Sequence, residues 1–415
     1  MHKSIMFRNI VSVSGIFLSV SLAACSSGSG SSGANGSSGV AYVLNDQTWN
    51  ISRCPLDPDG NLNNCDLITP TDESGNNIMR TANSDGEPGT TAAGIVFNKQ
   101  YAYIGIANNG SSSYNSYISV CSLGFNGELT SCKNVDTNVL FESATSRVSQ
   151  TPILNNKIYF TSRSQAQAGI ESNGYIVWCD LADNGSILSS TCKNINDKSN
   201  EPGNLVLFGN YGLTISNNHI YTISARNKLV SILTLDSAGN ILADSLYLDH
   251  GLNANGVSVL ESPRKMTIVN GYAYITDPGY NGTDDSLVVC QVNGENGHLY
   301  NCQPEYARDK YTDKNILLGP VGIGSYGNKV YPLNWGYNRD ELGHTAGVCD
   351  LFSGKDTLSC ITSYGYDSNM EGTFNIPMDM AVISANQIKL NSVKGVNKKS
   401  VPLLAPNKFM EAQLP

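Results

Sequence analysis

The sequence has few charged residues and lacks long amphipathic stretches. Only 15% of the 415 residues are charged, and the formal net charge is −9. Short apolar runs alternate with Asn-Gly and Asp-Gly turn signals, a pattern typical of strands rather than helices. These features predict an all-β protein. They exclude nucleic acid as an expected partner, because an acidic chain repels phosphate groups.

The sequence also lacks the short motifs of common catalytic sites. It contains no Gly-x-Ser-x-Gly elbow, no His-Glu-x-x-His pair and no P-loop. Its cysteines are too far apart for the close ligand pairs of zinc sites, so we weigh metal binding as the minor alternative. We therefore predict no catalytic residue, no metal and no cofactor.

The N-terminal residues predict export. Lys3 and Arg8 precede an apolar run, residues 10–20, that is too short to span a bilayer. Leu22-Ala23-Ala24-Cys25 then resembles a bacterial lipobox, which implies lipidation of Cys25 after removal of residues 1–24. The alternative is an ordinary signal-peptidase site. Ser26 after the cysteine implies, by resemblance to Gram-negative lipoproteins, the outer membrane.

Two further observations agree with a lipid anchor at Cys25. Residues 25–39 are almost entirely Ser and Gly after the cysteine, which is the composition of a flexible tether. The cysteine count is 11, so setting Cys25 aside leaves an even number that can pair. Removal of residues 1–24 takes away two basic residues and changes the formal charge from −9 to −11. We expect a lipid-anchored protein of the cell envelope.

The remaining cysteines define a repeat. They form five close pairs, and the wide gap between the third and fourth pairs predicts a sixth unit without cysteines. In that unit Leu233 and Leu246 have the separation of Cys179 and Cys192, which predicts an apolar pair in place of a disulfide. The predicted disulfides join Cys54 to Cys65, Cys121 to Cys132, Cys179 to Cys192, Cys290 to Cys302 and Cys349 to Cys360.

Each unit contains the strand content of one propeller blade. An apolar run, an Asn-rich turn and a Tyr-bearing strand precede the two cysteine strands, which makes four strands. The tyrosines at matching places are Tyr42, Tyr103, Tyr159, Tyr221, Tyr274 and Tyr331. We predict a β-propeller over residues 40–393 with six four-stranded blades, and seven blades as the alternative. Residues 394–415 are expected to form an extended tail.

Turn signals between paired cysteines support antiparallel pairing across short hairpins. Asp59-Gly60 and Asn126-Gly127 lie midway between their cysteines and predict two-residue turns, whereas Glu295-Asn296-Gly297 predicts a three-residue loop. Directly opposed residues in such a ladder are close enough for a disulfide. The pairing also fits an oxidising compartment.

The first unit lacks its opening strand, because the tether stands where that strand should be. Residues 380–386 match an opening strand and its turn, but no cysteine pair follows them. We therefore predict that this C-terminal segment completes the first blade and closes the ring.

The first unit resembles a known type of repeat. Its segment Ala41-Tyr42-Val43-Leu44-Asn45, with Cys54-Pro55-Leu56 and Asp59-Gly60-Asn61-Leu62 after it, is similar to the YVTN-type repeats of lactonase-like bacterial propellers. Leu44 stands where the motif has Thr, and members of that family usually have seven blades. The resemblance implies a propeller fold and raises lactone hydrolysis as a candidate activity.

Two groups of residues are candidate sites. Long connections between the second and third strands should share one face, on which aromatic, acidic and basic side chains could hold a sugar or a peptide: Tyr114, Glu171, Tyr280, Asp284, Asp285, Trp335, Tyr337, Arg339, Asp340 and His344. The entrance of the central channel should carry Arg147, Gln150, Asn210, Glu261, Arg264, Lys265 and Asp379. The alternative for the first group is a set of variable surface loops. His219 and His298 are interpreted as solvated turn residues.

The leading functional hypothesis is a non-catalytic binding or scaffold propeller that is anchored to the outer membrane and binds a protein or glycan partner. The first alternative is a lactonase-like or other hydrolytic propeller. The second alternative is a surface adhesin.

Overall fold

The computed structural model describes most of the chain between Gly39 and Ser384. The described residues are 39–46, 48–79, 90–108, 116–137, 146–148, 150–164, 174–196, 207, 210–242, 245–279, 285–335, 344–354, 357–365, 367, 369 and 371–384. The expected signal peptide, Cys25, the tether up to residue 38 and the tail 394–415 lie outside them.

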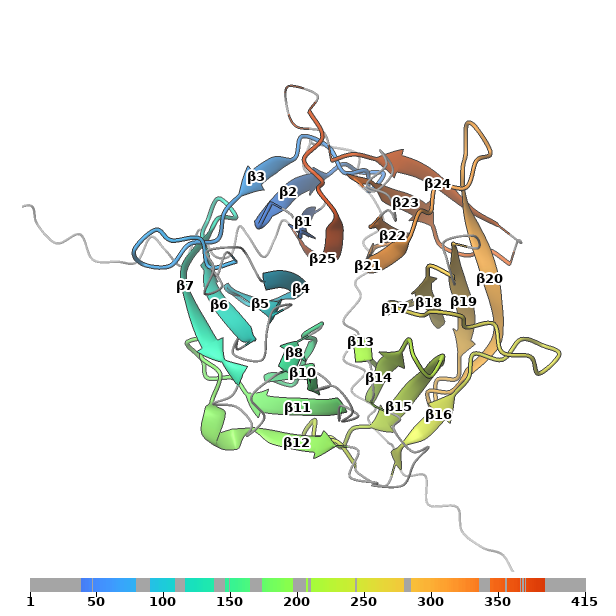
Figure 1. Cartoon of the computed structure of the whole chain (residues 1–415), viewed down its shortest axis with the longest axis horizontal. Coiled ribbons are helices and arrows are strands. Elements are labelled where there is room, and N and C mark those ends of the chain that lie inside the picture. The colour runs from blue at the N-terminus through green and yellow to red at the C-terminus, as the bar shows by residue number, and fades with distance from the viewer. Residues whose placement is uncertain are drawn as a thin grey trace, which may run out of the picture. The chain divides into compact units, whose positions relative to one another are not determined.

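The described strands form six antiparallel blades around a central axis (Figure 1). Blade 1 contains, from the axis outward, β25 (Pro377–Ser384), β1 (Gly39–Asn45), β2 (Asn50–Leu56) and β3 (Asp66–Ile68). Blade 2 contains β4 (Thr90–Asn98), β5 (Tyr101–Asn108), β6 (Tyr117–Leu123) and β7 (Leu129–Asp136). Blade 3 contains β8 (Ser146–Val148), β9 (Ile153–Leu154), β10 (Lys157–Ser164), β11 (Gly174–Asp180) and β12 (Lys193–Asn196), with a 3-10 turn, Ser189–Thr191.

The second half of the ring repeats this arrangement. Blade 4 contains β13 (Asn210–Ser216), β14 (His219–Ser224), β15 (Leu229–Thr234) and β16 (Tyr247–Asp249). Blade 5 contains β17 (Met266–Val269), β18 (Tyr272–Asp277), β19 (Ser286–Val292) and β20 (Leu299–Asp309). Blade 6 contains β21 (Pro320–Tyr326), β22 (Lys329–Asn334), β23 (Ala346–Asp350) and β24 (Thr357–Ser363).

The ring is closed by the C-terminal strand, as predicted. β25 pairs antiparallel with β1 along its length, from Gly39 opposite Ser384 to Asn45 opposite Pro377. The innermost strand of blade 1 therefore comes from the opposite end of the propeller sequence. Within the described residues this closure gives six blades, not seven.

All five predicted disulfides are present, and each lies within one blade. Each bond joins the third strand of its blade to the outermost strand or to the segment that leads into it. In blade 6 the ladder register places Cys349 directly opposite Cys360, whereas in blades 2 and 5 a register shift falls at the first cysteine of the pair. Five disulfides identify an extracytoplasmic protein, because thiols stay reduced in the cytosol.

The predicted apolar pair of blade 4 is only half correct. Leu233 is 1% exposed and packs in the core, but Leu246 is 39% exposed. The β15–β16 ladder ends at Ile232 opposite Tyr247, one position before these leucines. Leu246 therefore does not hold the outer strand as a disulfide would.

The hairpins are longer than predicted. In blade 1 the Gly60 amide donates to the Asp57 carbonyl and the Asp57 amide to the Asn61 carbonyl, which closes a three-residue loop. Gly60 has φ 81°, a conformation that glycine adopts without strain. Blade 2 has the same loop, ending at Gly127. The predicted two-residue turns are therefore wrong, because the midpoint between two cysteines does not reveal the extra residue that a bulge absorbs.

The repeated tyrosines join neighbouring blades. All six are fully buried, and four donate their hydroxyl to the carbonyl of the hairpin glycine in the next blade: Tyr42 to Gly127, Tyr103 to Gly185, Tyr159 to Gly239 and Tyr331 to Gly60. The Tyr274 hydroxyl instead accepts the Phe352 amide of blade 6 at 2.9 Å. Only Tyr221 lacks such a bond among the described residues. The repeat tyrosines are thus buried inter-blade fasteners.

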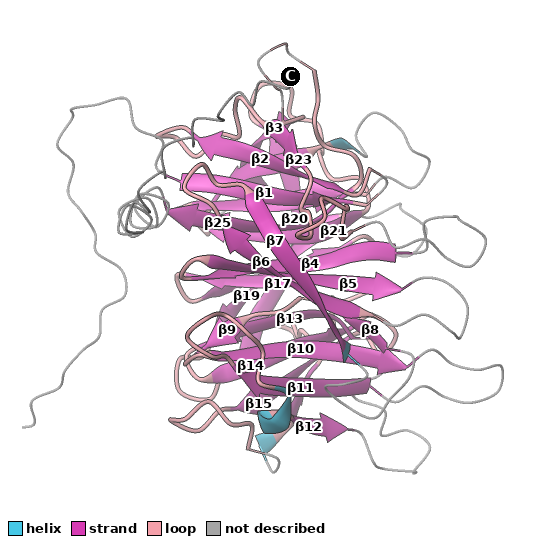
Figure 2. Cartoon of the chain, turned by 90° about the vertical axis from the view of Figure 1, so that its left-hand side faces the viewer, coloured by secondary structure: helices cyan, strands magenta, loops and turns pink. Residues whose placement is uncertain are grey.

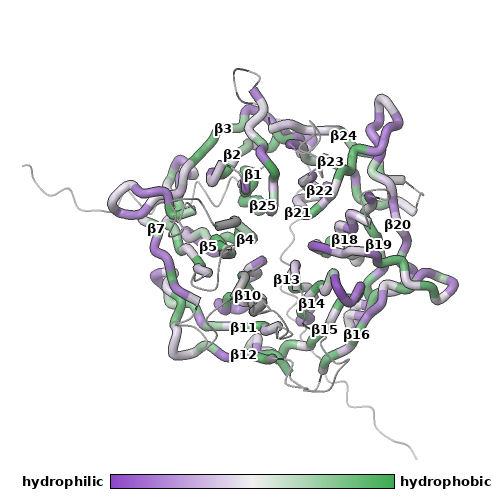
Figure 3. The backbone as a smooth tube through the Cα atoms, in the orientation of Figure 1, coloured by the Kyte–Doolittle hydropathy of each residue, from purple (hydrophilic) through white to green (hydrophobic). Residues whose placement is uncertain are grey.

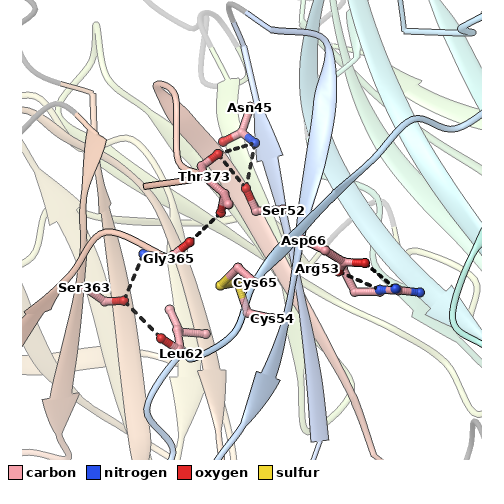
Figure 4. The surroundings of a disulfide bond; sticks show 10 residues. All are labelled: Asn45, Ser52, Arg53, Cys54, Leu62, Cys65, Asp66, Ser363, Gly365 and Thr373. Atoms are coloured by element: carbon pink, nitrogen blue, oxygen red, sulfur yellow. Dashed lines mark hydrogen bonds and ion pairs between the residues drawn. A yellow bond between two sulfur atoms is a disulfide. The ribbon is translucent and has the colours of Figure 1, made fainter. Parts of the chain in front are cut away.

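Several connections between blades cover the edge of the following blade. The Cys132 amide of blade 2 donates to the Thr71 carbonyl, and β20 continues past blade 5 to pair parallel with β24. Between blades 6 and 1, Ser52 Oγ donates to the Thr373 carbonyl at 2.8 Å, close to the Cys54–Cys65 disulfide (Figure 4). These contacts occupy backbone groups that an open edge would leave free.

Hydrophobic and hydrophilic stretches are interspersed along the blades (Figure 3). The strands of neighbouring blades are stacked face to face in the side view (Figure 2). Their inward side chains form clusters between adjacent blades, such as the one that joins Tyr42 and Leu44 of blade 1 to Ile104 of blade 2. No helix within the described part of the chain is long and apolar enough to cross a membrane.

Candidate functional sites

The structure describes only three of the predicted loop-face residues. Trp335 follows β22, is 41% exposed, and its backbone amide donates to the Gly319 carbonyl. His344 is half-buried, and Asp285 is buried beside the start of β19. The other candidates lie outside the described residues: Tyr114, Glu171, Tyr280, Asp284, Tyr337, Arg339 and Asp340. The loop-face site therefore stays a prediction.

Three of the predicted channel residues meet at the axis. Lys265 precedes β17 in blade 5, Asp379 lies in β25 of blade 1, and Gln150 follows β8 in blade 3. Lys265 Nζ lies 3.0 Å from Asp379 Oδ1, and Gln150 Nε2 donates to the same oxygen at 3.1 Å. The Lys265 and Asp379 side chains are only 6% and 3% exposed.

Every polar atom of this axial cluster has a partner. Lys265 Nζ also donates to the carbonyls of Ala93 and Met378, at 2.6 and 2.9 Å. The second Asp379 oxygen accepts the Ile95 amide at 3.0 Å. Burial lowers the pKa of Lys265, and the Asp379 carboxylate opposes that shift. These bonds link blade 5 to blades 1 and 2 across the axis, a structural role that satisfies the buried charges.

The remaining channel candidates do not join the cluster through any described contact. The Arg264 guanidinium lies over the Tyr211 ring, 4.5 Å from its centroid, and Glu261 is exposed. Arg147 lies in β8 and Asn210 begins β13, but nothing is described of their side chains. Gln150 also accepts the Leu213 amide of blade 4 through its Oε1, at 3.1 Å.

A cavity of about 620 Å³ opens between blade 4 and the outer hairpin of blade 5. It lies at the end of the strands where Asn217 and Asn218 join β13 to β14, opposite the end from which Trp335 emerges. Its volume falls within the range of small-molecule sites. The polar lining consists of Asn217, Asn218, His219, Thr234, Ser245 and Tyr247 from blade 4, with Glu295, Asn296 and His298 from blade 5.

Blade 4 differs from blades 3 and 6 at this cavity. In blades 3 and 6 the residue two positions before the repeat tyrosine is a lysine that pairs with an opposed aspartate, Lys157 with Asp180 and Lys329 with Asp350. In blade 4 His219 lies opposite Thr234 instead. The pair at this position is Val40–Pro55 in blade 1, Tyr101–Ser122 in blade 2 and Tyr272–Gln291 in blade 5, so the ion pair is particular to blades 3 and 6.

The hairpin of blade 5 is one residue longer than those of blades 1 and 2. The Gly297 amide donates to the Asn293 carbonyl and the Asn293 amide to the His298 carbonyl, which closes a four-residue loop rather than the predicted three-residue loop. Gly297 has φ 73°, so its left-handed position is confirmed. Tyr221 reaches this loop, but its hydroxyl has no hydrogen-bond partner within the described structure. Burial raises the pKa of Tyr221 to about 12.

Two imidazoles line the cavity. The Tyr247 and His298 rings stack at a centroid distance of 3.6 Å and an angle of 9°. His219 Nδ1 lies 2.8 Å from the Asn217 carbonyl oxygen, which can only accept, so Nδ1 carries the proton. In the neutral ring, Nε2 is therefore an acceptor.

The interpretation of His219 as a solvated turn residue is wrong, because its side chain is 5% exposed. It lies at the first position of β14 and is covered by the blade 5 hairpin. Alignment of the repeats carries no distinct signal for this site, since the pair at this position varies from blade to blade and is Tyr101–Ser122 in blade 2 and Tyr272–Gln291 in blade 5. Within the described residues, no group of three or more His, Cys, Asp or Glu side chains is placed to hold a metal ion.

Known proteins resemble this chain only distantly. No protein-family model and no curated protein matches the chain. A provisionally named 6-phosphogluconolactonase from Bacteroides uniformis is 11% identical, with 83% of this chain and 100% of that chain covered and a TM-score of 0.48. A similarly named protein from Bacteroides fragilis is 12% identical, over 84% and 98% of the two chains, with a TM-score of 0.45. A chain of a nidogen/laminin complex is 11% identical, over 83% and 98%, with a TM-score of 0.47. The assignment as a β-propeller rests on the strand order and on the closure of the ring by β25, and disulfides lie within five of its blades.

Proposed function

We propose that this chain is a binding propeller of the cell envelope that holds a partner without transforming it. The observation that carries the proposal is the cavity at the interface between blades 4 and 5. Four other interfaces are fastened by a tyrosine hydroxyl on a hairpin glycine, whereas this one contains a cavity of about 620 Å³. One altered interface in a ring of similar repeats is a natural place for a specific site.

The axial cluster supports binding away from the channel. Lys265 and Asp379 are committed to each other and to backbone atoms, so a ligand there would have to break bonds that join blades. The axis is therefore better suited to holding the ring together than to exchanging protons with a substrate.

An extracytoplasmic location and a membrane anchor rest on different observations. The disulfides place the propeller outside the cytoplasm. Attachment to the outer membrane through Cys25 is part of the proposal and rests on the lipobox-like residues before it and on Ser26 after it. A Cys25→Ser variant should appear in the soluble envelope fraction, whereas the native chain should sediment with membranes. Equal sedimentation of both would remove the anchor from the proposal.

Binding and hydrolysis can be separated in one experiment. Full-length protein in detergent is immobilised and exposed separately to the protein and polysaccharide fractions of the native envelope, and the same preparation is assayed against a panel of lactones. We expect saturable binding to one fraction and lactone hydrolysis at the buffer rate. Hydrolysis above that rate that disappears in Glu261→Gln and Arg264→Lys variants would establish the enzymatic alternative.

The adhesin alternative has its own test at the loop face. Trp335→Ala and Tyr337→Ala variants are compared with the native chain in a cell-attachment assay. Loss of attachment would favour an adhesin that uses the loop face, while unchanged attachment leaves the blade 4–5 interface as the proposed binding region.

A further inference from the structure

We propose that the cavity between blades 4 and 5 binds a neutral saccharide. This inference rests on the proposed binding function and narrows it to one class of ligand at one place. It follows from three properties of the cavity: the charge of its lining, the hydrogen-bonding groups in it and the stacked rings at its side.

The charge of the lining disfavours anionic ligands. Glu295 contributes one carboxylate, and neither lysine nor arginine is among the lining residues. An anion entering this space would lose hydration and meet a negative group without a compensating cation. Phosphorylated sugars and sugar acids are therefore poor candidates, and a ligand without net charge is favoured.

The polar lining offers both donors and acceptors at close spacing. The side chains of Asn217, Asn218 and Asn296 carry amides, which combine a donor and an acceptor in one group. Thr234 adds a hydroxyl, and His219 adds Nε2 as an acceptor because the Asn217 carbonyl fixes the proton on Nδ1. A sugar ring carries several hydroxyls that each donate and accept, so it can satisfy such a set.

A flat aromatic platform lies beside these groups. Tyr247 stacks on His298, and Tyr247 remains 42% exposed. His298 covers one face of the Tyr247 ring, and the exposed part of that ring offers an apolar surface of the kind that packs against the C–H face of a pyranose. Ile232 and Leu235 extend the apolar part of the lining.

A double substitution in blade 4, taken from the residues at the same position in blades 3 and 6, should fill the cavity. His219→Lys with Thr234→Asp reproduces the directly opposed pair that blades 3 and 6 carry. The matched control is Lys329→His with Asp350→Thr, which makes the reverse exchange in blade 6, outside the cavity lining. Both doubles alter a pair at an equivalent position, so a general effect on the fold would be seen in both.

The test uses the full-length chain and ligand-detected NMR with neutral disaccharides of hexose and N-acetylhexosamine, glucuronate as the anionic probe and a neutral tripeptide. We expect saturable binding of at least one neutral disaccharide and none of glucuronate. The His219→Lys/Thr234→Asp double and Tyr247→Ala should each weaken binding at least tenfold, while the blade 6 double keeps native affinity. Circular dichroism of each variant verifies folding.

The outcomes separate this inference from the proposed function. If envelope proteins bind saturably but no disaccharide does, the saccharide site is wrong and the binding function stands. If disaccharide binding survives in the blade 4 double, the ligand lies elsewhere and the cavity assignment is wrong. Tripeptide or glucuronate binding that the blade 4 double abolishes would place a different chemistry in the cavity and overturn the saccharide class.

Discussion

The interface between blades 6 and 1 and the interface between blades 4 and 5 are built from the same repeat but differ in how they are held. At the first, Tyr331 donates to the Gly60 carbonyl at 2.8 Å, beside the Cys54–Cys65 disulfide. At the second, the Tyr221 hydroxyl has no partner among the described residues, and a cavity separates part of blade 4 from the next hairpin.

This difference shows how a repeat ring can acquire a site without a new fold. Each blade contacts its neighbours through a few equivalent positions, so a change at one interface leaves the other interfaces intact. In blade 4 the pair His219–Thr234 stands where blades 3 and 6 have Lys–Asp, and blade 5 contributes a hairpin loop one residue longer than those of blades 1 and 2. The neighbouring fastened interfaces hold the ring while this one is free to diverge.

The largest expected effect concerns the axial cluster, which links blade 5 to blades 1 and 2. Lys265→Met would leave the Asp379 carboxylate buried without its cation, and we expect a loss of about 3–5 kcal/mol in the free energy of unfolding, measured with urea. The Lys265→Met/Asp379→Asn double removes the uncompensated charge and should recover part of the loss. A double as unstable as the sum of the two single variants would show that the pair is not coupled.

The second prediction removes the disulfide of blade 1 and, in a separate variant, introduces one into blade 4. Cys54→Ala/Cys65→Ala should lower the free energy of unfolding by up to about 3 kcal/mol, because the unfolded chain gains conformational entropy when the short loop between the cysteines is no longer closed. Leu233→Cys/Leu246→Cys should raise the free energy of unfolding. The β15–β16 ladder ends at Ile232 opposite Tyr247, and the same register continued by one position opposes the two new cysteines. The gain must disappear under reducing conditions, and a gain that persists with dithiothreitol would have another cause.

The third prediction removes single hydroxyls. Tyr331→Phe should cost about 1 kcal/mol, because it deletes a buried hydrogen bond and leaves the Gly60 carbonyl without its donor. Tyr221→Phe should cost nothing or stabilise slightly, since its hydroxyl is buried without a partner. Equal losses in thermal unfolding for the two variants would mean that blade 4 is fastened like the others.

The smallest effect is a dependence on alkaline pH. Burial raises the pKa of Tyr221 to about 12, so the folded state holds this proton more tightly than the unfolded state. The resulting stability is complete below about pH 10, the ordinary tyrosine pKa, and is lost as the pH rises towards 12. Tyr221→Phe should therefore gain stability relative to the native chain over this range. A difference that stays constant from pH 9 to 11.5 would contradict the shifted pKa.

Much of the architecture was predictable because it is encoded at short range and repeated. The pairs such as Cys121 and Cys132 lie close in sequence, so hairpin register alone brings them together. The displaced first strand was evident because the tether occupies its place and a matching segment follows blade 6. The lengths of the hairpin loops are harder to predict from the sequence, since a bulge shifts the register by one residue without changing the cysteine spacing.

The candidate sites were predicted less well than the fold. Three residues of the channel group, Lys265, Asp379 and Gln150, come together in the structure, but the sequence could not show that Lys265 would pair with Asp379 from another blade. No local pattern predicts the burial of His219, because the hairpin that covers it lies almost 80 residues further along the chain. Contacts between blades depend on where each blade lies in the ring, which no local pattern contains.

The sequence by itself determined the all-β composition, the blade repeat, the cysteine pairing and the source of the closing strand, because each follows from strand periodicity and short-range register. Only the tertiary structure decided what the repeated positions do. It made the tyrosines contacts between blades, committed the axial charges to one another, and left a cavity beside the contact between blade 4 and the longer hairpin of blade 5.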